Sequence, residues 1–306
     1  MDDLKRCVGI NLTSSKLQFV EIEKKSDLLI VDNLGQSFLR PPIIFDEQNE
    51  IVIQEQIQAA FDEIKIRTPL KSNTVSFTLP PELFITIQLP YDSNLNQAEI
   101  KEEFNWEISQ LLPFISIDDL AVKFYELQEG LLPGKNNALI VALNKKYLML
   151  IKNFCVKNYL TPKLVDNASI TANSFINSFY NSRNGPTINI FNSRKSISLF
   201  INISSKPAFV KAFPKDDNEY VNKIIDEISK INIRGVVKNN FNGAIFSGED
   251  LESDLLSEIG RGTELVFEKL NPFEMIKFRQ DFNDQQILSE QFSSFISATG
   301  IATRFN

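Results

Sequence analysis

The chain has 306 residues, enough for one large domain or two of ordinary size, and its net charge of −7 argues against nucleic acid as a main partner. It has no histidine and only two cysteines, Cys7 and Cys155, which excludes Ser-His and Cys-His nucleophiles and leaves too few ligands for a zinc site. No apolar run reaches the roughly 20 residues of a membrane-spanning helix, and no secretory signal precedes the first strand. The composition therefore predicts a cytoplasmic globular protein and excludes most hydrolase and metalloenzyme chemistries.

Residues 7–34 are predicted to form three short strands joined by tight polar turns. Apolar residues recur mostly at every second position, which is typical of strands that bury one face. Val20 and Ile22 change this parity and indicate either a bulge or a strand that is buried on both faces. The turn at residues 11–16 is small and polar.

Helices and strands are predicted to alternate between residues 37 and 180. Helices are expected at residues 54–66, 97–112, 145–159 and 168–180, and strands or extended edges at residues 37–45, 74–79, 83–89, 120–127, 137–143 and 161–165. The strand–helix–strand block at about residues 82–130 is predicted to be a small inserted subdomain. The apolar run at residues 137–143 is predicted to be a buried strand with which the chain returns to the main core.

A second meander is predicted at residues 186–214, after a polar, turn-rich boundary near residue 183. It is followed by a helix at 216–231 capped by Asp216 or Asp217, a strand at 243–247, a helix at 251–259, a strand at 264–270 and a helix at 287–305. Two meanders about one domain apart favour two related halves, residues 1–182 and 183–306, that face a cleft. Ordinary β-meanders would give the same pattern.

Five short stretches, in this order along the chain, carry a resemblance to a known family. They are VGINLTSS at residues 8–15, EEFNWEISQLLPF at 102–114, Leu164-Val165-Asp166 with Ala172-Asn173, Asn271-Pro272-Phe273, and SATGIA at 297–302. By these motifs the chain resembles the PilM family of type IV pilus assembly proteins, which are cytoplasmic relatives of the cell-division protein FtsA. The resemblance implies an actin-like α/β fold of two lobes, each a mixed sheet with helices. The first lobe would carry a small inserted α+β subdomain and the second a reduced one.

The resemblance also implies a first phosphate loop, from which this chain departs. Asn11 and Thr13, followed by Ser14, stand where the family has an acidic residue for the metal and a glycine that lets the backbone close on phosphate. Glycine permits close approaches that a β-branched residue resists. The first loop is therefore expected to be degenerate.

The other two nucleotide loops are predicted to be degenerate as well. Asn189 and Phe191, before Ser193, stand where the family has an aspartate and a glycine. The third loop is reduced to Ser247-Gly248-Glu249-Asp250, and two carboxylates there would repel the phosphates of a nucleotide if they faced it. We expect no cofactor, no metal and no catalytic residue.

The resemblance implies a scaffold that binds the cytoplasmic N-terminal tail of a bitopic inner-membrane protein similar to PilN. Such a scaffold would lie in the cytoplasm, peripheral to the inner membrane. The groove for the tail is expected near Phe84, Leu111, Pro113 and Phe114, although these residues equally suit the core of the subdomain. Other assembly proteins as partners, and a homodimer, remain open.

Two alternatives remain. An ATP-switched protein or ATPase of the same fold would hold Mg²⁺ through Asn11 or Asn189, and Lys16 and Lys195 would attract phosphate, although solvated turn lysines explain the pattern as well. The related L component of type II secretion has the same fold but also a membrane span, which is lacking here.

Overall fold

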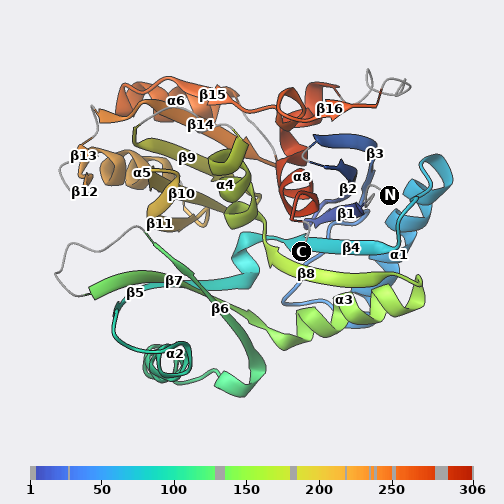
Figure 1. The fold of residues 1–306 in the computed structure, drawn as a ribbon, viewed down its shortest axis with the longest axis horizontal. Helices are drawn as coiled ribbons and strands as arrows, with labels where there is room; N and C mark the ends of the chain where they lie inside the picture. Colours follow the sequence, from blue (N-terminus) through green and yellow to red (C-terminus); the bar gives the residue numbers. More distant parts are fainter. Residues whose placement is uncertain are drawn as a thin grey trace.

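The computed structural model describes residues 5–26, 28–127, 135–179, 185–217, 219–233, 236–237, 240–249, 253–279 and 289–304. Within these residues the strands form sheets of six, five, three and two strands (Figure 1). The two larger sheets lie side by side in the upper part of the view, and the three-stranded sheet lies below them.

The first sheet has the order β16-β3-β2-β1-β4-β8. Its strands are β1 (Lys5–Leu12), β2 (Lys16–Lys25), β3 (Leu28–Phe38), β4 (Thr74–Leu79), β8 (Thr161–Asn167) and β16 (Lys277–Phe278). The register of β2 against β3 shifts between Glu21 and Ile22, and the first eight residues of β2 are buried. Both a bulge and burial on two faces therefore explain the change of parity at Val20 and Ile22.

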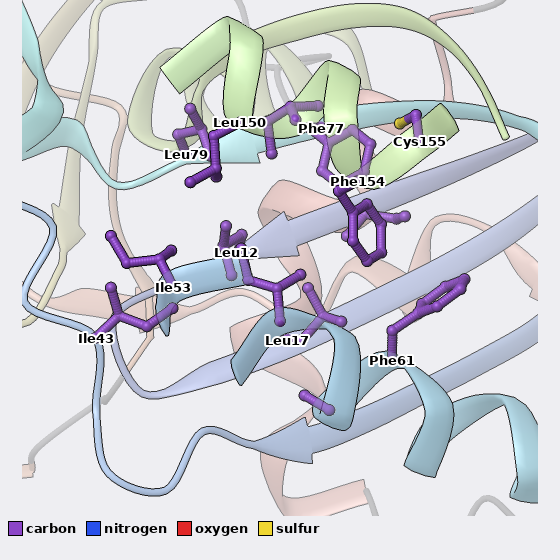
Figure 2. Close-up of a cluster of buried hydrophobic side chains, with 14 of the residues drawn as sticks. Leu12, Leu17, Ile43, Ile53, Phe61, Phe77, Leu79, Leu150, Phe154 and Cys155 are labelled. Atoms are coloured by element: carbon purple, nitrogen blue, oxygen red, sulfur yellow. The ribbon is translucent and has the colours of Figure 1, made fainter. Parts of the chain in front are cut away.

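Helices α1 (Glu50–Arg67) and α3 (Lys145–Lys157) pack on one face of this sheet. Figure 2 shows their side chains meeting those of β1, β2 and β4, with Phe61 of α1 and Phe154 of α3 in an edge-to-face contact whose centroids are 5.1 Å apart. Helix α1 begins four residues before the predicted start, because the Asn49 side chain accepts the N–H of Ile51 and caps it there.

The second sheet has the order β11-β10-β9-β14-β15. Its strands are β9 (Thr187–Asn192), β10 (Ser196–Ile203), β11 (Lys206–Pro214), β14 (Gly243–Gly248) and β15 (Phe267–Lys269), and α5 (Tyr220–Ser229) and α6 (Ser253–Thr263) pack on one face. Helix α5 starts later than the predicted residue 216. Asp217 accepts the N–H of Glu219 and so closes a turn before the helix instead of capping it.

Helices α4 (Ala168–Phe179) and α8 (Ile296–Ala302) lie between the two larger sheets and share one apolar core with both. Residues 289–295 form a 3₁₀ segment, η5 (Ser289–Phe295), so the predicted single helix at 287–305 is shorter and only partly α-helical. Phe295 is fully buried in this shared core. Truncation of such a side chain to alanine typically costs about 3–5 kcal/mol.

The inserted subdomain has three strands in the order β5-β7-β6, namely β5 (Phe84–Asp92), β7 (Lys135–Asn144) and β6 (Leu120–Glu126). Helix α2 (Gln97–Leu111) packs on one face through Ile100, Phe104 and Ile108. The prediction that residues 137–143 return to the main core was wrong, because β7 is the central strand of this sheet. An apolar run signals burial on both faces but does not identify the sheet.

Two contacts that join the subdomain to the rest of the molecule lie on β7 and at the end of β8. On the face of β7 away from α2, Leu139 and Val141 pack with Phe200 of β10 and Val210 of β11. At the end of β8, Asp166 accepts the hydroxyl of Tyr125 from β6 (2.7 and 2.6 Å to its two oxygens) and pairs with Arg304. Burial, with the Asp166 carboxylate as a second cause, raises the pKa of Tyr125 above its ordinary value of 10.

The predicted boundary at residues 182/183 lies outside the described residues. The strand pairing shows that the C-terminal part of the chain contacts both larger sheets, because β15 lies in the second sheet and β16 pairs in parallel with β3 of the first.

Between α5 and β14, the described residues contain a two-stranded ladder of β12 (Asn232–Ile233) and β13 (Val236–Val237). Short 3₁₀ turns occur at Pro81–Leu83, Ile117–Asp119 and Pro272–Glu274.

A cluster of buried carboxylates, paired with partly exposed cations, attaches the C-terminal segment to the first sheet. Arg279, just after β16, binds Glu23 of β2 and Asp32 of β3 (both 2.6 Å). Glu21 lies beside them, and both of its carboxylate oxygens accept the N–H of Lys71 (3.2 Å each). Burial is the main cause that raises the pKa of Glu21 above its ordinary 4.5, and the charge of Asp32 raises it further.

Glu21→Gln is expected to flatten part of the pH dependence of stability. A carboxyl with a raised folded-state pKa contributes stability that is present below pH 4.5 and lost as pH rises through the folded pKa. The free energy of unfolding of the wild type, relative to the variant, should therefore fall as pH rises above 4.5 in denaturant titrations. The exposed control Glu55→Gln should show no such slope, and a pH-independent difference for Glu21→Gln would contradict the prediction.

Candidate functional site

The hairpin between β1 and β2 holds the first predicted phosphate loop. Asn11 is buried, and its amide is bonded at both ends: Nδ2 donates to Gln18 Oε1 (3.1 Å), and Oδ1 accepts the hydroxyl of Thr78 (2.9 Å). A metal ion at Asn11 would have to displace the hydrogen bond from Thr78. The residue lacks the negative charge that normally compensates such a change.

Thr13 closes this hairpin with its own side chain. Its hydroxyl accepts the N–H groups of Ser15 (3.2 Å) and Lys16 (3.1 Å), while its N–H donates to the carbonyl of Lys16 (2.9 Å). Ser193 closes the second hairpin in the same way, accepting the N–H of Ser196 (3.2 Å) and donating its own N–H to the Ser196 carbonyl (2.9 Å). Hydroxyl residues at these positions therefore stabilise the turns themselves.

The strand register places Phe191, not Asn189, at the position equivalent to Asn11. Asn11 lies opposite Gln18 in the first hairpin and Phe191 opposite Ser198 in the second, each two residues before the closing hydroxyl. This alignment of the hairpins differs by two residues from the one inferred from the sequence. Phe191 is buried in the core between the sheets, and Asn189 donates to Asn173 of α4 (2.7 Å).

The two hairpins and the third predicted loop are bonded to neighbouring segments. The buried ammonium of Lys16 donates to the carbonyl of Glu249 (2.9 Å). The backbone N–H of Glu249 in turn donates to the carbonyl of Asn192 (2.9 Å). Ser193 Oγ donates to Glu82 from the turn after β4 (3.1 Å). Hydrogen bonds within the protein therefore link the first hairpin to the third loop, the third loop to the second hairpin, and the second hairpin to the first lobe.

Gly248 and Ser247 end β14 beside β9. Gly248 has a φ of +129°, and a Cβ there would lie 2.0 Å from the carbonyl oxygen of Asn192. The glycine is therefore required by the close approach of two strands. Ser247 is buried and donates to the carbonyl of Ile190 (3.4 Å), and Ser14 is buried in the first turn.

The four predicted partner-binding residues fall into two groups. Phe84 begins β5, packs against the cores that join the subdomain to both lobes, and lines a cavity of about 240 Å³. Leu111, Pro113 and Phe114 are exposed at the C-terminal end of α2, and Phe114 is 99% exposed. Core packing, the alternative reading from the sequence, explains Phe84 but not the other three.

Two further apolar residues at this end of the subdomain were missed in the sequence analysis. Trp106 is 60% exposed on α2, and Ile115 is 38% exposed in the turn that follows. Trp106 lies two residues from Phe104, which places it across the helix from the buried stripe, and that spacing was a usable signal. Lys145 Nζ donates to the carbonyl of Asp118 (2.6 Å), which holds this turn beside the start of α3.

Among the described residues, no group of three His, Cys, Asp or Glu side chains has an arrangement that would hold a metal ion. Cys7 and Cys155 are buried thiols, and burial raises the pKa of Cys155 to about 12. None of the helices in the described part of the chain is long and apolar enough to span a membrane.

A family model described as type IV pilus assembly protein PilM matches residues 9–197, more than half of the chain. The chain belongs to the PilM family. A chain in the solved structure of a PilM-PilN type IV pilus biogenesis complex is similar to it, with a TM-score of 0.73 and 14% identity over 97% of this chain and 98% of that one. No curated protein matches the sequence.

Other solved structures resemble this PilM-family chain less strongly. A Bacteroides thetaiotaomicron protein with an actin-like ATPase fold and unknown function has a TM-score of 0.50 and 10% identity, over 93% of this chain and 95% of that one. The cytoplasmic domain of EpsL, an inner-membrane component of the type II secretion system of Vibrio cholerae, has a TM-score of 0.45 and 9% identity, over 88% and 98%. The likenesses to the PilM chain and the Bacteroides protein show that the predicted actin-like fold is correct.

Lys16→Ala is expected to destabilise this PilM-family protein by about 1–3 kcal/mol, because a buried charged hydrogen bond between the first hairpin and Glu249 is lost. The free energy of unfolding in urea measures the effect. Lys195→Ala, at an exposed position in the turn of the second hairpin, serves as the control and should change stability by less than about 0.5 kcal/mol. Equal effects of the two substitutions would show that the Lys16 contact contributes nothing.

Proposed function

We propose that this protein is a non-catalytic scaffold of an inner-membrane assembly platform, and that it binds the cytoplasmic tail of a membrane protein similar to PilN. The exposed apolar end of α2 carries the proposal: Phe114 is 99% exposed and Leu111 is 52% exposed. An exposed aromatic side chain beside other apolar residues is typical of an interaction site. On this proposal the protein works in the cytoplasm, at the membrane surface.

The surroundings of Phe114 support capture of a peptide. A hydrogen bond from Lys145 to the carbonyl of Asp118 joins the segment after α2 to the start of α3. A preorganised apolar surface binds an extended or helical peptide without any cofactor. The solved structure with the strongest likeness reported above is a complex with PilN, which supports the same kind of partner for this chain.

We further propose that the nucleotide site of the fold has lost ATP binding. Three observations support this: Phe191 is buried at the position equivalent to Asn11, Asn11 is bonded at both ends, and Lys16 is bonded to Glu249. A nucleotide would have to break the Lys16 contact to use this lysine as a phosphate ligand. The alternative function, an ATP-dependent switch in the same machinery, needs such a rearrangement.

Phe114→Ala is expected to weaken binding of the partner tail by about tenfold or more, since burial of a phenylalanine side chain contributes about 1.5–3 kcal/mol. The measurement is calorimetric titration with a peptide of the cytoplasmic N-terminal tail of the PilN-like protein from the same organism. Ile66→Ala, which removes an 83% exposed side chain from α1, is the control and should leave affinity unchanged. Equal affinity of wild type and Phe114→Ala would remove Phe114 from the site.

Titration of the wild-type protein with ATP and Mg²⁺ is expected to give no binding heat at millimolar nucleotide and no rise in melting temperature. A ligand that binds only the folded state raises stability by mass action, so thermal unfolding is an independent check. Saturable, magnesium-dependent binding would favour the alternative of a nucleotide switch.

A further inference from the structure

The net charge of the chain is concentrated in the inserted subdomain. Residues 82–127 contain nine carboxylates and two lysines, a net charge of −7 that equals the charge of the whole chain. The remaining residues are balanced overall. The subdomain therefore presents a negative surface on a molecule that is otherwise nearly neutral.

Helix α2 carries part of this charge in an arrangement that does not stabilise the helix. Glu99, Glu103 and Glu107 follow each other at four-residue spacing, and like charges at this spacing repel one another. Glu99 completes the capping box with Asn96, which explains only the first of them. The described residues give no ion-pair partner to Glu103 or Glu107.

Exposed apolar side chains lie within the same stretch of chain. Four of them, which we call the apolar tip, lie within residues 106–115, in the second half of α2 and the turn after it: Trp106, Leu111, Phe114 and Ile115. Asp118 and Asp119 follow three and four residues after Ile115 and are exposed. The tip is thus a segment with four exposed apolar side chains that is flanked by carboxylates on both sides along the chain.

We propose that the apolar tip binds a segment that is both apolar and cationic, namely the stretch of the partner tail that leads into its membrane span. This rests on the proposed function and specifies the chemistry of its partner. The cytoplasmic flanks of membrane proteins carry an excess of lysine and arginine. Such a segment would place apolar side chains on Trp106 and Phe114. Its cations would lie beside Glu102 and Glu107, and complementary charge of this kind contributes to the specificity and the association rate of binding.

Two other occupants fit the surface less well. The cytoplasmic face of a membrane is negative and would repel the carboxylates around the tip. A second copy of the chain offers cations around a cavity of about 550 Å³ that is lined by Arg6, Lys65 and Lys71, but Arg6 and Lys71 are already bonded to Glu23 and Asp32. A cationic peptide satisfies both features of the tip.

Trp106 is the only tryptophan in the sequence, so its fluorescence reports on the tip alone. The probe is a 12-residue peptide of leucine, lysine and serine without tryptophan, compared with versions in which glutamate replaces lysine or serine replaces leucine. We expect the leucine–lysine peptide to move the emission to shorter wavelength, with affinity about tenfold lower in 0.5 M than in 0.05 M salt. The other two peptides should bind at least about tenfold more weakly.

Matched variants test the contribution of charge. The triple variant E102Q/E107Q/D119N should bind the leucine–lysine peptide about three- to tenfold more weakly, since each exposed pair contributes little. The control E47Q/E50Q/E55Q removes the same charge around the start of α1 and should bind as the wild type does. Equal affinity of the two triple variants, or equal binding of the lysine and glutamate peptides, would overturn the proposal.

Other outcomes identify a different occupant. A shift of Trp106 emission with phosphatidylglycerol vesicles would overturn the proposal in favour of lipid, and a shift with protein concentration alone would do so in favour of a second copy. If the natural tail binds without salt dependence or without moving the emission, this inference fails while the scaffold function stands. If the model peptides bind as expected and the natural tail does not, the proposed function fails and the chemistry of the tip stands.

Discussion

The close approach of α8 to β1 is the constraint on which the arrangement of the lobes depends. A Cβ at Gly9 would lie 2.0 Å from the carbonyl oxygen of Ala298, so only glycine lets the helix backbone rest on the strand. From that position α8 packs on α4, and Phe295 and Phe191 fill the core between the sheets. The two large sheets therefore share an apolar core rather than facing each other across open solvent.

Because the shared core already orders the hairpins, the polar contacts that they make cost little conformational entropy. Lys16, Ser193 and the backbone of Glu249 bind partners within the chain, and each bond joins segments that the core already holds in place. On the proposed function, these internal hydrogen bonds hold the two lobes together in a scaffold that binds no nucleotide.

Local patterns predicted most of the elements, and tertiary pairing accounts for the errors. The strand β4 and the start of α2 were predicted correctly because turn residues and the Asn96–Glu99 capping box mark their ends in the sequence. The sheet to which β7 belongs and the equivalence of Phe191 with Asn11 depend on which strands pair, and no local pattern contains that information. Trp106 was missed because a helical stripe identifies the buried side and leaves the other side unexamined.

Packed side chains join helix α2 of the inserted subdomain, through its sheet, to the second lobe. Phe104 packs helix α2 on its sheet. Its ring makes edge-to-face contacts with Tyr91 and Phe124, with ring centroids 5.8 Å and 5.3 Å apart. The opposite face of the same sheet packs on Phe200 and Val210, and Gln88 bonds the backbone of Val210, which lies in an edge strand of the second sheet. Close-packed interiors move as units. On the proposed function, a partner bound at the end of α2 would contact a helix that is packed, through its sheet, against the second lobe.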